Sequence, residues 1–345
     1  MKNNLLLKNI KKAIKNNYFL YKLLSNDIFS LKPVAVPEKY PTDISIELTS
    51  LCNSKCTFCT HEKLVNISKS KVAKHMEYDY AITIINKIRE LIDQQNIPDK
   101  DIRLAFNGLG EPLLYPHFFE VIEASRKLFP EARFSSNTNC IALDEKTAER
   151  LVNCGLNDIT LSLAFNDAQS YKKWIDLDRY DLVVKNITYF LKTKGNRLPE
   201  VNLYIFDQYM NRNNFSAFMK QWRPLLNSND SYHIRKLLSL FDWSYKPGIK
   251  YPCHELWSLL IIDINGHVYP CCPAIWTDKN EELRLGHILN DSTKTLLTNL
   301  NVIRERHING DFGICDCCSV LIDNKSLCKR AYSKAKKFDV LKFKV

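Results

Sequence analysis

Apolar and polar positions between residues 44 and 240 follow two patterns that alternate along the chain. Segments in which apolar residues alternate with polar ones, as in a strand, are followed by segments in which apolar residues recur three or four positions apart, as on one face of a helix. The strand-like segments are Ile44–Ser50, Ile102–Asn107, Arg133–Asn137, Asp158–Leu163, Val201–Phe206 and His233–Leu238. The helix-like segments are Asp79–Asp93, His117–Phe129, Asp144–Asn153, Leu182–Leu191 and Asn214–Trp222.

This repeat of strand and helix predicts an α/β fold, with a parallel sheet and helices packed outside it. Five or six units are fewer than the eight of a complete barrel. We therefore expect a partial barrel with one open side. Reactive groups of such folds gather at the C-terminal ends of the strands, so the loops that leave the strands there are the candidates for a functional site.

Length and composition limit the setting of the protein. The chain has 345 residues, of which 45% are hydrophobic, enough for one large barrel or two domains. No apolar run approaches the roughly 20 residues of a membrane span, and the run Leu5–Leu7 is too short for a secretory signal. Twelve cysteines in such a chain indicate metal ligands in a reducing cytoplasm rather than a secreted disulfide scaffold.

The net charge of +11 is concentrated at the two ends of the chain. Residues 1–26 carry six lysines and no acid, and residues 328–345 carry seven basic residues and one acid. The apolar positions of residues 5–24 suit a helix docked on the body or a peripheral contact with an anionic membrane surface, and a solvated tail is the plain alternative. A nucleic-acid partner is not expected, because the body between the ends is close to neutral.

A loop with three cysteines directly after the first predicted strand carries the strongest chemical signal. Cys52, Cys56 and Cys59 stand in the sequence CNSKCTFC. Three thiolates can hold three irons of a cubane cluster and leave the fourth iron open to another ligand. The alternatives are a zinc site, which needs a fourth ligand from elsewhere in the chain, and buried structural cysteines.

This Cys-x3-Cys-x2-Cys spacing resembles the signature of the radical SAM enzymes, and the resemblance covers roughly residues 40–240. It implies a [4Fe–4S] cluster whose open iron binds S-adenosylmethionine (SAM). It also implies that SAM is cleaved reductively and that the resulting 5′-deoxyadenosyl radical takes a hydrogen atom from a substrate carbon. An electron donor such as a flavodoxin or a ferredoxin is expected as a partner.

The segment NGLGEP, residues 107–112, follows the second predicted strand. Its two glycines permit a close approach of backbone to a ligand. The resemblance implies that Gly110 and Glu111 hold the methionine amino group of SAM. It further implies that Phe58, between the last two cysteines, lies along the adenine.

Polar residues end the third and fourth predicted strands. Ser136 and Asn137 end the third strand, and Ser162 ends the fourth. The resemblance implies contacts from these residues to the methionine carboxylate and the ribose, and ordinary capping of the strand ends is the alternative. Relatives often carry an acid two residues beyond this serine. The residue here is Ala164, so no carboxylate role is expected at that position.

Cysteine becomes dense after residue 246. The spacing of four of these cysteines resembles the SPASM/twitch extension of one branch of the radical SAM superfamily, which holds one or two auxiliary [4Fe–4S] clusters. The implied ligands are Cys253, Cys271, Cys315 and Cys318. Ligands of the fuller pattern are missing, with Asn324 at one of their positions, so we expect one auxiliary cluster.

Other cysteines leave this ligand set open. Cys272, Cys317 and Cys328 are close enough in sequence to compete for ligand positions, and a zinc ribbon remains the alternative to a cluster. Cys140 and Cys154 lie apart from both groups and are assigned to packing.

These observations predict a partial (β/α)6 barrel with a cysteine-rich C-terminal extension. The expected domains are a basic helical segment (1–40), the barrel (41–245), the SPASM/twitch-like extension (246–330) and a basic tail (331–345). The expected reaction is oxidation of a carbohydrate, a cyclitol or another small alcohol, with the auxiliary cluster accepting an electron. The alternatives are modification of a peptide or protein by thioether formation or residue oxidation, modification of RNA, and a non-enzymatic metal protein.

No residue is predicted as the substrate base. Asp263 and His267 are close in sequence to the second cysteine group, but they belong to a predicted hairpin that turns at Asn265 and Gly266.

Overall fold

The structure is a computed structural model. It describes residues 40–61, 64–65, 72–206, 212–235, 252–275, 277 and 281–318. The predicted N-terminal helical segment, apart from Tyr40, and the predicted basic tail lie outside the described residues. In the part of the chain that is described, no helix combines the length and the apolar character needed to span a membrane.

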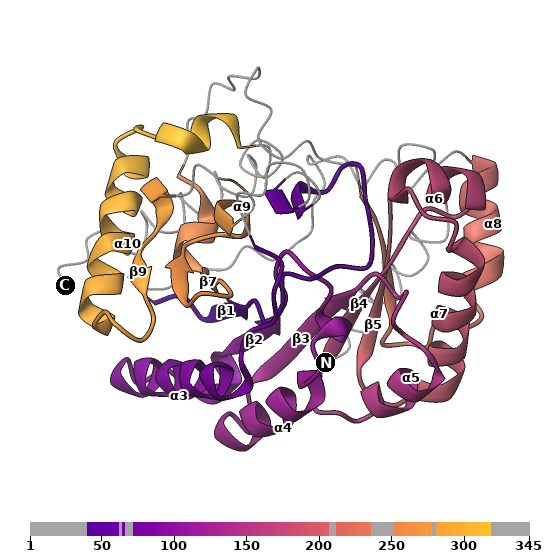
Figure 1. The fold of residues 1–345 in the computed structure, drawn as a ribbon, viewed down its shortest axis with the longest axis horizontal. Coiled ribbons are helices and arrows are strands. Elements are labelled where there is room, and N and C mark those ends of the chain that lie inside the picture. Colours follow the sequence, from indigo (N-terminus) through magenta and orange to yellow (C-terminus); the bar gives the residue numbers. More distant parts are fainter. Residues whose placement is uncertain are drawn as a thin grey trace, which may run out of the picture.

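One nine-stranded sheet forms the centre of the fold, with the strand order β6-β5-β4-β3-β2-β1-β7-β8-β9 (Figure 1). Neighbouring strands from β6 to β7 run parallel, and β7, β8 and β9 run antiparallel. The strands are β1 (Asp43–Ile46), β2 (Arg103–Phe106), β3 (Arg133–Thr138), β4 (Asp158–Ala164), β5 (Glu200–Phe206), β6 (Ser231–Arg235), β7 (Leu259–Ile262), β8 (His267–Tyr269) and β9 (Gly286–His287).

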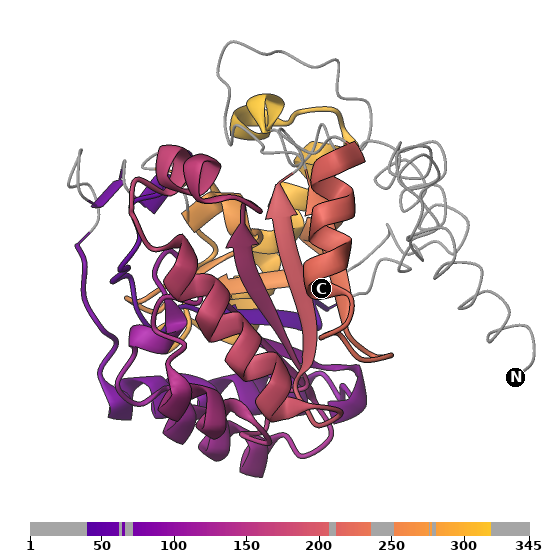
Figure 2. The same ribbon diagram turned by 90° about the vertical axis from the view of Figure 1, so that its right-hand side faces the viewer.

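Helices cover the outside of the curved sheet, and α10 packs beside β9 (Figures 1 and 2). They are α3 (Tyr78–Gln94), α4 (Phe118–Leu128), α5 (Glu145–Leu151), α6 (Ala168–Ile175), α7 (Tyr180–Lys194), α8 (Arg212–Trp222), the short α9 (Cys272–Ile275) and α10 (Thr293–Ile308). Aspartates accept hydrogen bonds at the first turns of two of them, Asp144 from the Thr147 N–H (2.8 Å) and Asp167 from the Ser170 N–H (2.7 Å). The alternation of β1 to β6 with these helices confirms the predicted partial α/β barrel.

Several elements differ from the sequence prediction. Strand β1 ends at Ile46, four residues before the predicted end at Ser50. Strand β6 begins at Ser231, two residues before the predicted start, and residues 236–238 of the predicted strand lie outside the described residues. Helix α6 was not predicted. It has eight residues and buries only Tyr171 and Ile175, which is too short a pattern to stand out as helical periodicity.

The C-terminal region continues the barrel sheet. Strand β7 pairs in parallel with β1, with Asp43 opposite Leu259 and Ser45 opposite Ile261. Strands β7 and β8 form the predicted hairpin, in which Gly266 has a φ of +85°. Residues 236–251, which include the expected domain boundary, are outside the described part. The extension is therefore joined to the barrel edge to edge through its first strand.

The hairpin is also held by its own side chains. The Asp263 carboxylate accepts hydrogen bonds from the Asn265 N–H (2.8 Å) and the His267 N–H (3.0 Å). This carboxylate is buried. Asp263 and His267 therefore have the structural surroundings that the sequence predicted for them.

Candidate active site

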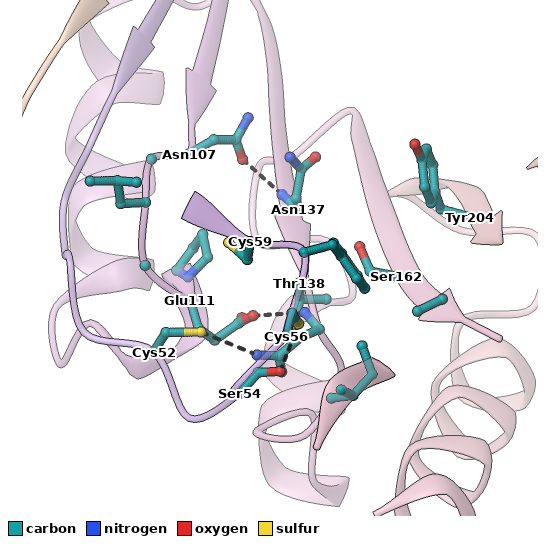
Figure 3. A pocket seen from close by; sticks show the side chains of 18 of the residues that line it. Cys52, Ser54, Cys56, Cys59, Asn107, Glu111, Asn137, Thr138, Ser162 and Tyr204 are labelled. Atoms are coloured by element: carbon teal, nitrogen blue, oxygen red, sulfur yellow. Dashed lines mark hydrogen bonds between the residues drawn. The ribbon is translucent and has the colours of Figure 1, made fainter. Parts of the chain in front are cut away.

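A cavity of about 830 Å³, partly open to solvent, lies at the C-terminal ends of the barrel strands (Figure 3). The cysteine loop forms one side, the NGLGEP segment another, and residues from the ends of β3, β4 and β5 complete it. The cavity thus brings together the three loop cysteines with Glu111, which are far apart in the sequence.

Hydrogen bonds fix the cysteine loop and reach its sulfur atoms. The Cys59 N–H donates to the Cys56 carbonyl (2.9 Å), and the Ser54 hydroxyl lies 3.0 Å from the Cys56 sulfur. The Asn139 amide donates to the Cys52 sulfur (3.8 Å), and the His61 N–H donates to Cys59 (3.4 Å). Donors of this kind stabilise negative charge on thiolates.

The three thiols lie at one cavity, as a cluster held by all three requires. Cys52, Cys56 and Cys59 all belong to its lining. A cubane distributes its cysteine ligands over separate irons. Burial raises the pKa of the Cys52 thiol to about 12, so the positive charge of bound metal is needed to hold this ligand as a thiolate.

The NGLGEP segment lies directly against the cysteine loop. A Cβ atom at Gly110 would lie 2.4 Å from the Leu51 carbonyl oxygen and 2.5 Å from that of Thr49. The next residue, Glu111, donates its N–H to the Leu51 carbonyl (2.8 Å). Only glycine permits this approach of two backbone segments.

Glu111 is a buried carboxylate at the wall of the cavity. It accepts hydrogen bonds from the Asn139 N–H (2.7 Å) and the Leu113 N–H (3.1 Å). Burial raises the pKa of Glu111 to about 7, although hydrogen bonds from Asn139, Thr138 and Leu113 oppose this shift. The carboxyl group is thus placed to change its charge near neutral pH.

A second buried carboxylate ties the NGLGEP segment to the C-terminal hairpin. Glu47 accepts hydrogen bonds from the Leu109 N–H (2.6 Å) and the Ile264 N–H (3.1 Å). A Cβ atom at Gly108 would overlap the Glu47 side chain. The NGLGEP segment, which is predicted to bind SAM, is therefore in contact with the cysteine loop. Through Glu47 it is also connected to the C-terminal hairpin.

Phe58 lies in an aromatic cluster at the cavity wall. Its ring centroid is 5.0 Å from that of Phe206 and 6.5 Å from those of Phe165 and Trp174. The Thr57 N–H donates to the Trp174 carbonyl (2.9 Å). Helix α6, which carries Trp174, thus supports the cysteine loop and offers an apolar wall for a flat ring.

The predicted polar residues at the strand ends divide into two groups. Asn137 and Ser162 line the cavity, and the Asn107 side chain accepts a hydrogen bond from the Asn137 N–H (2.8 Å; Figure 3). Ser136 is buried, donates to the Phe106 carbonyl (2.8 Å), and is not among the described residues that line the cavity. The prediction for Ser136 rested on position alone, whereas its side chain bridges β2 and β3.

Sequence reasoning missed several further cavity residues, among them Thr138, Asn139, Tyr171 and Tyr204. The polar run from Ser135 to Asn139, at the end of the third strand, was the signal for the first two. The two tyrosines could not be predicted, because each lies in an amphipathic segment in which an aromatic residue is expected to be part of the hydrophobic core.

A second cavity of about 1090 Å³, partly open to solvent, occupies the inside of the barrel. It shares Asn107, Asn137 and Tyr204 with the first cavity, and it also reaches Leu259 and Cys272 of the C-terminal region. We call this cavity the lumen. A ligand in the lumen can contact both the SAM cavity and the extension.

Three of the four predicted auxiliary ligands, Cys271, Cys315 and Cys318, are near enough for electrostatic influence. Burial raises the pKa of Cys271, and the neighbouring thiols of Cys315 and Cys318 raise it further. The backbone N–H of Cys253 donates to the Nδ1 atom of His307 (3.3 Å). Cys272 instead lines the lumen. The side chain of Cys317 and the whole of Cys328 lie outside the described part.

Comparison with known proteins identifies both regions. Residues 46–210 match the model of the Radical SAM superfamily, and residues 253–319 match that of an iron–sulfur cluster-binding domain, SPASM. The GTP 3′,8-cyclase of Mycolicibacterium smegmatis is 30% identical over 145 residues, which are 40% of this chain and 35% of that protein. The GTP 3′,8-cyclase of Chlorobaculum tepidum is 26% identical over 150 residues, 44% of this chain and 41% of that protein. The chain thus spans well under half the length of these relatives.

Solved structures share the fold at low sequence identity. Native anSMEcpe with bound AdoMet has a TM-score of 0.58 and 17% identity, covering 87% of this chain and 98% of that one. BtrN in complex with AdoMet and 2-DOIA has a TM-score of 0.51 and 16% identity, covering 82% and 93%. SuiB of Streptococcus suis bound to the precursor peptide SuiA has a TM-score of 0.51 and 14% identity, covering 81% and 71%.

These matches confirm the predicted fold class, the enzyme class and the cofactors. The first region is of the kind that binds a [4Fe–4S] cluster and SAM, and the second is of the kind that binds an auxiliary iron–sulfur cluster.

Proposed function

Because this chain belongs to the radical SAM superfamily and carries a C-terminal iron–sulfur cluster-binding domain, we propose that it oxidises a carbohydrate, a cyclitol or another small alcohol. When bound, the first cluster and SAM supply a 5′-deoxyadenosyl radical. The substrate carbinol carbon gives one hydrogen atom to this radical, which leaves as 5′-deoxyadenosine beside methionine. An auxiliary cluster held by Cys253, Cys271, Cys315 and Cys318 would supply the acceptor for the one remaining electron, and the hydroxyl proton would pass to water, so that a carbonyl group remains.

The observation that carries this proposal is the connection of the two cavities. The lumen shares Asn107, Asn137 and Tyr204 with the cavity of the cysteine loop. The lumen also reaches Cys272, the sequence neighbour of the proposed cluster ligand Cys271. A small substrate in the lumen would therefore contact the SAM cavity and the C-terminal region at the same time.

Different residues of the first cavity bind the first cluster and SAM. Cys52, Cys56 and Cys59 hold the first cluster. Gly110 and Glu111 receive the methionine amino group of SAM, the Glu111 carboxylate accepting its hydrogen bond. Each of these assignments rests on the lining of the cavity and on the family resemblance.

Other residues hold the remaining parts of SAM and the second cluster. Phe58 covers the adenine, and Asn137 and Ser162 contact the ribose and the methionine carboxylate. Ser136 acts indirectly, because its hydroxyl group fixes the end of β3 against β2. The four ligands of the auxiliary cluster are Cys253, Cys271, Cys315 and Cys318.

The family chemistry also needs a source of electrons. A flavodoxin or ferredoxin is the proposed electron donor. Each turnover takes one electron from the donor and releases one electron from the substrate, so one carbonyl and one 5′-deoxyadenosine should form per SAM. No net reductant is consumed when the auxiliary cluster passes its electron back to the donor.

The experiment uses protein reconstituted without oxygen. We expect about eight irons per chain for two cubanes. A deuterium-labelled cell extract is separated into a small neutral fraction and a peptide fraction, and each is incubated with the reduced enzyme and SAM. Deuterium in 5′-deoxyadenosine from the neutral fraction, with a new carbonyl product, supports the proposal. Deuterium from the peptide fraction alone rejects it in favour of peptide modification.

A further inference from the structure

A row of amide and hydroxyl side chains crosses the inside of the barrel. Asn137 on β3 pairs in register with Thr160 on β4, which pairs with Asn202 on β5. All three line the lumen, and we call them the polar ladder. Because neighbouring strands lie about 4.8 Å apart, the ladder presents hydrogen-bonding groups at several points across a ring-sized ligand.

The polar ladder has side-chain donors and acceptors that no other described residue engages. In the described part of the chain, no residue pairs with the Asn137 side-chain amide or the Thr160 hydroxyl. Ser231 on β6 donates its hydroxyl to the Asn202 side-chain oxygen, which leaves the Asn202 NH2 group as a donor. The Asn137 end of the ladder also belongs to the SAM cavity. A ligand held by the ladder therefore extends to the place where hydrogen abstraction occurs.

The charges around the two cavities do not suit a phosphate. Among the described residues that line them, Arg103 is the one lysine or arginine, and its guanidinium already lies 3.4 Å from the Asp158 carboxylate. Arg103 begins β2, four residues before Asn107, which is about 13 Å along an extended strand. Phosphate groups are recognised by arginine and lysine, whereas the described lining of the SAM cavity holds the Glu111 carboxyl group and neither arginine nor lysine.

We propose that the polar ladder binds the hydroxyl groups of an unphosphorylated polyol, and that Thr160 and Asn202 select this class of substrate. This inference rests on the proposed function, whose substrate it narrows. It separates this chain from enzymes that act on nucleoside triphosphates, for which several cationic groups are required. A site built to hydrogen-bond hydroxyl groups also rejects analogues that lack them.

The first test measures binding without turnover. Oxidised holoenzyme loaded with SAM is titrated calorimetrically with myo-inositol, scyllo-inositol and glucosamine, then with myo-inositol 1-phosphate, glucosamine 6-phosphate and GTP. We expect at least one unphosphorylated member to bind and its phosphate ester to bind at least tenfold more weakly. Tighter binding of a phosphate ester or GTP, or binding of no unphosphorylated member, overturns the proposal.

The second test changes the ladder itself. Thr160→Val removes one hydroxyl at nearly constant volume, and Asn202→Leu removes the amide. Each should weaken polyol binding about three- to tenfold, as expected for one lost hydrogen bond. The matched control is Thr83→Val on the exposed surface of α3, where the hydroxyl donates to the Asp79 carbonyl. If both ladder variants bind the polyol as tightly as the control, the lumen holds only water and the proposal fails.

The outcomes also separate this proposal from the function on which it rests. A polyol that binds through the ladder but gives no carbonyl product contradicts the proposed oxidation and leaves the substrate class standing. A polyol that is oxidised equally well by both ladder variants contradicts the ladder and leaves the oxidation standing.

Discussion

The charge of Glu111 should control the affinity for SAM near neutral pH. Burial raises the pKa of this carboxyl group from 4.5 to about 7. If the ionised form receives the methionine amino group, affinity falls as Glu111 is protonated. With a pKa of about 7, roughly one tenth of the groups are ionised at pH 6 and about three quarters at pH 7.5. The dissociation constant for SAM should therefore be about eightfold larger at pH 6 than at pH 7.5, a range that stays below the pKa of a free α-amino group.

The same shift predicts the sign of a stability effect. The folded-state pKa lies above the unfolded value, so this group contributes stability that is fully present below pH 4.5 and is lost as the pH rises through 7. A shift of about 2.5 units corresponds to roughly 3 kcal/mol as an order of magnitude. Protein without SAM should therefore lose stability between pH 5 and pH 8 relative to Glu111→Gln, which does not titrate.

Calorimetry in two buffers of different ionisation enthalpy tests the binding part. Binding of SAM to the reconstituted protein at pH 6.5 should release a proton, and Glu111→Gln should bind SAM with little dependence on pH and release none. Glu90→Gln, on the exposed surface of α3, serves as the matched control. A dissociation constant that stays constant from pH 6 to 7.5 in the unmodified protein, without proton release, refutes the reasoning.

Three further substitutions test the site and the fold. Cys56→Ala should lower the iron content by about four per chain and abolish 5′-deoxyadenosine formation, and retained cleavage of SAM contradicts the assignment of the loop. Gly110→Ala places a Cβ atom 2.4 Å from the Leu51 carbonyl oxygen. SAM should therefore bind at least tenfold more weakly, and the free energy of unfolding should fall by about 1–3 kcal/mol. An unchanged affinity for SAM, measured by calorimetry, contradicts the importance of this close contact. Lys194→Met removes the ammonium group that lies 3.0 Å from the buried Asp230 carboxylate; urea denaturation should show a loss of about 3–5 kcal/mol, and a loss below about 1 kcal/mol counts against this ion pair.

The barrel and its cysteine loop were predictable because their signals are local. Strand β5 buries every second residue, and helix α3 buries residues three or four positions apart. The sequence shows both spacings directly. Three cysteines within one short loop need no tertiary information to be recognised as a ligand set.

Features that depend on tertiary contacts were less accessible. The direction of the Ser136 hydroxyl, which bonds the Phe106 carbonyl instead of lining the cavity, follows from how β3 lies beside β2. The ladder of Thr160 and Asn202 needs the register between β4 and β5. The different surroundings of Cys271, which lies near Cys315 and Cys318, and of Cys272, which lines the lumen and begins a short helix, also depend on the fold.

The pairing of β7 with β1 has a practical consequence for protein engineering. Exchanging C-terminal regions between members of this superfamily is attractive as a way to change what they act upon. In this protein such a chimaera would have to supply a strand matched to Asp43–Ile46 and a backbone N–H matched to that of Ile264 for Glu47. A splice placed after Ile264, with β7 and the contact to Glu47 retained from the host, is therefore the better choice of crossover.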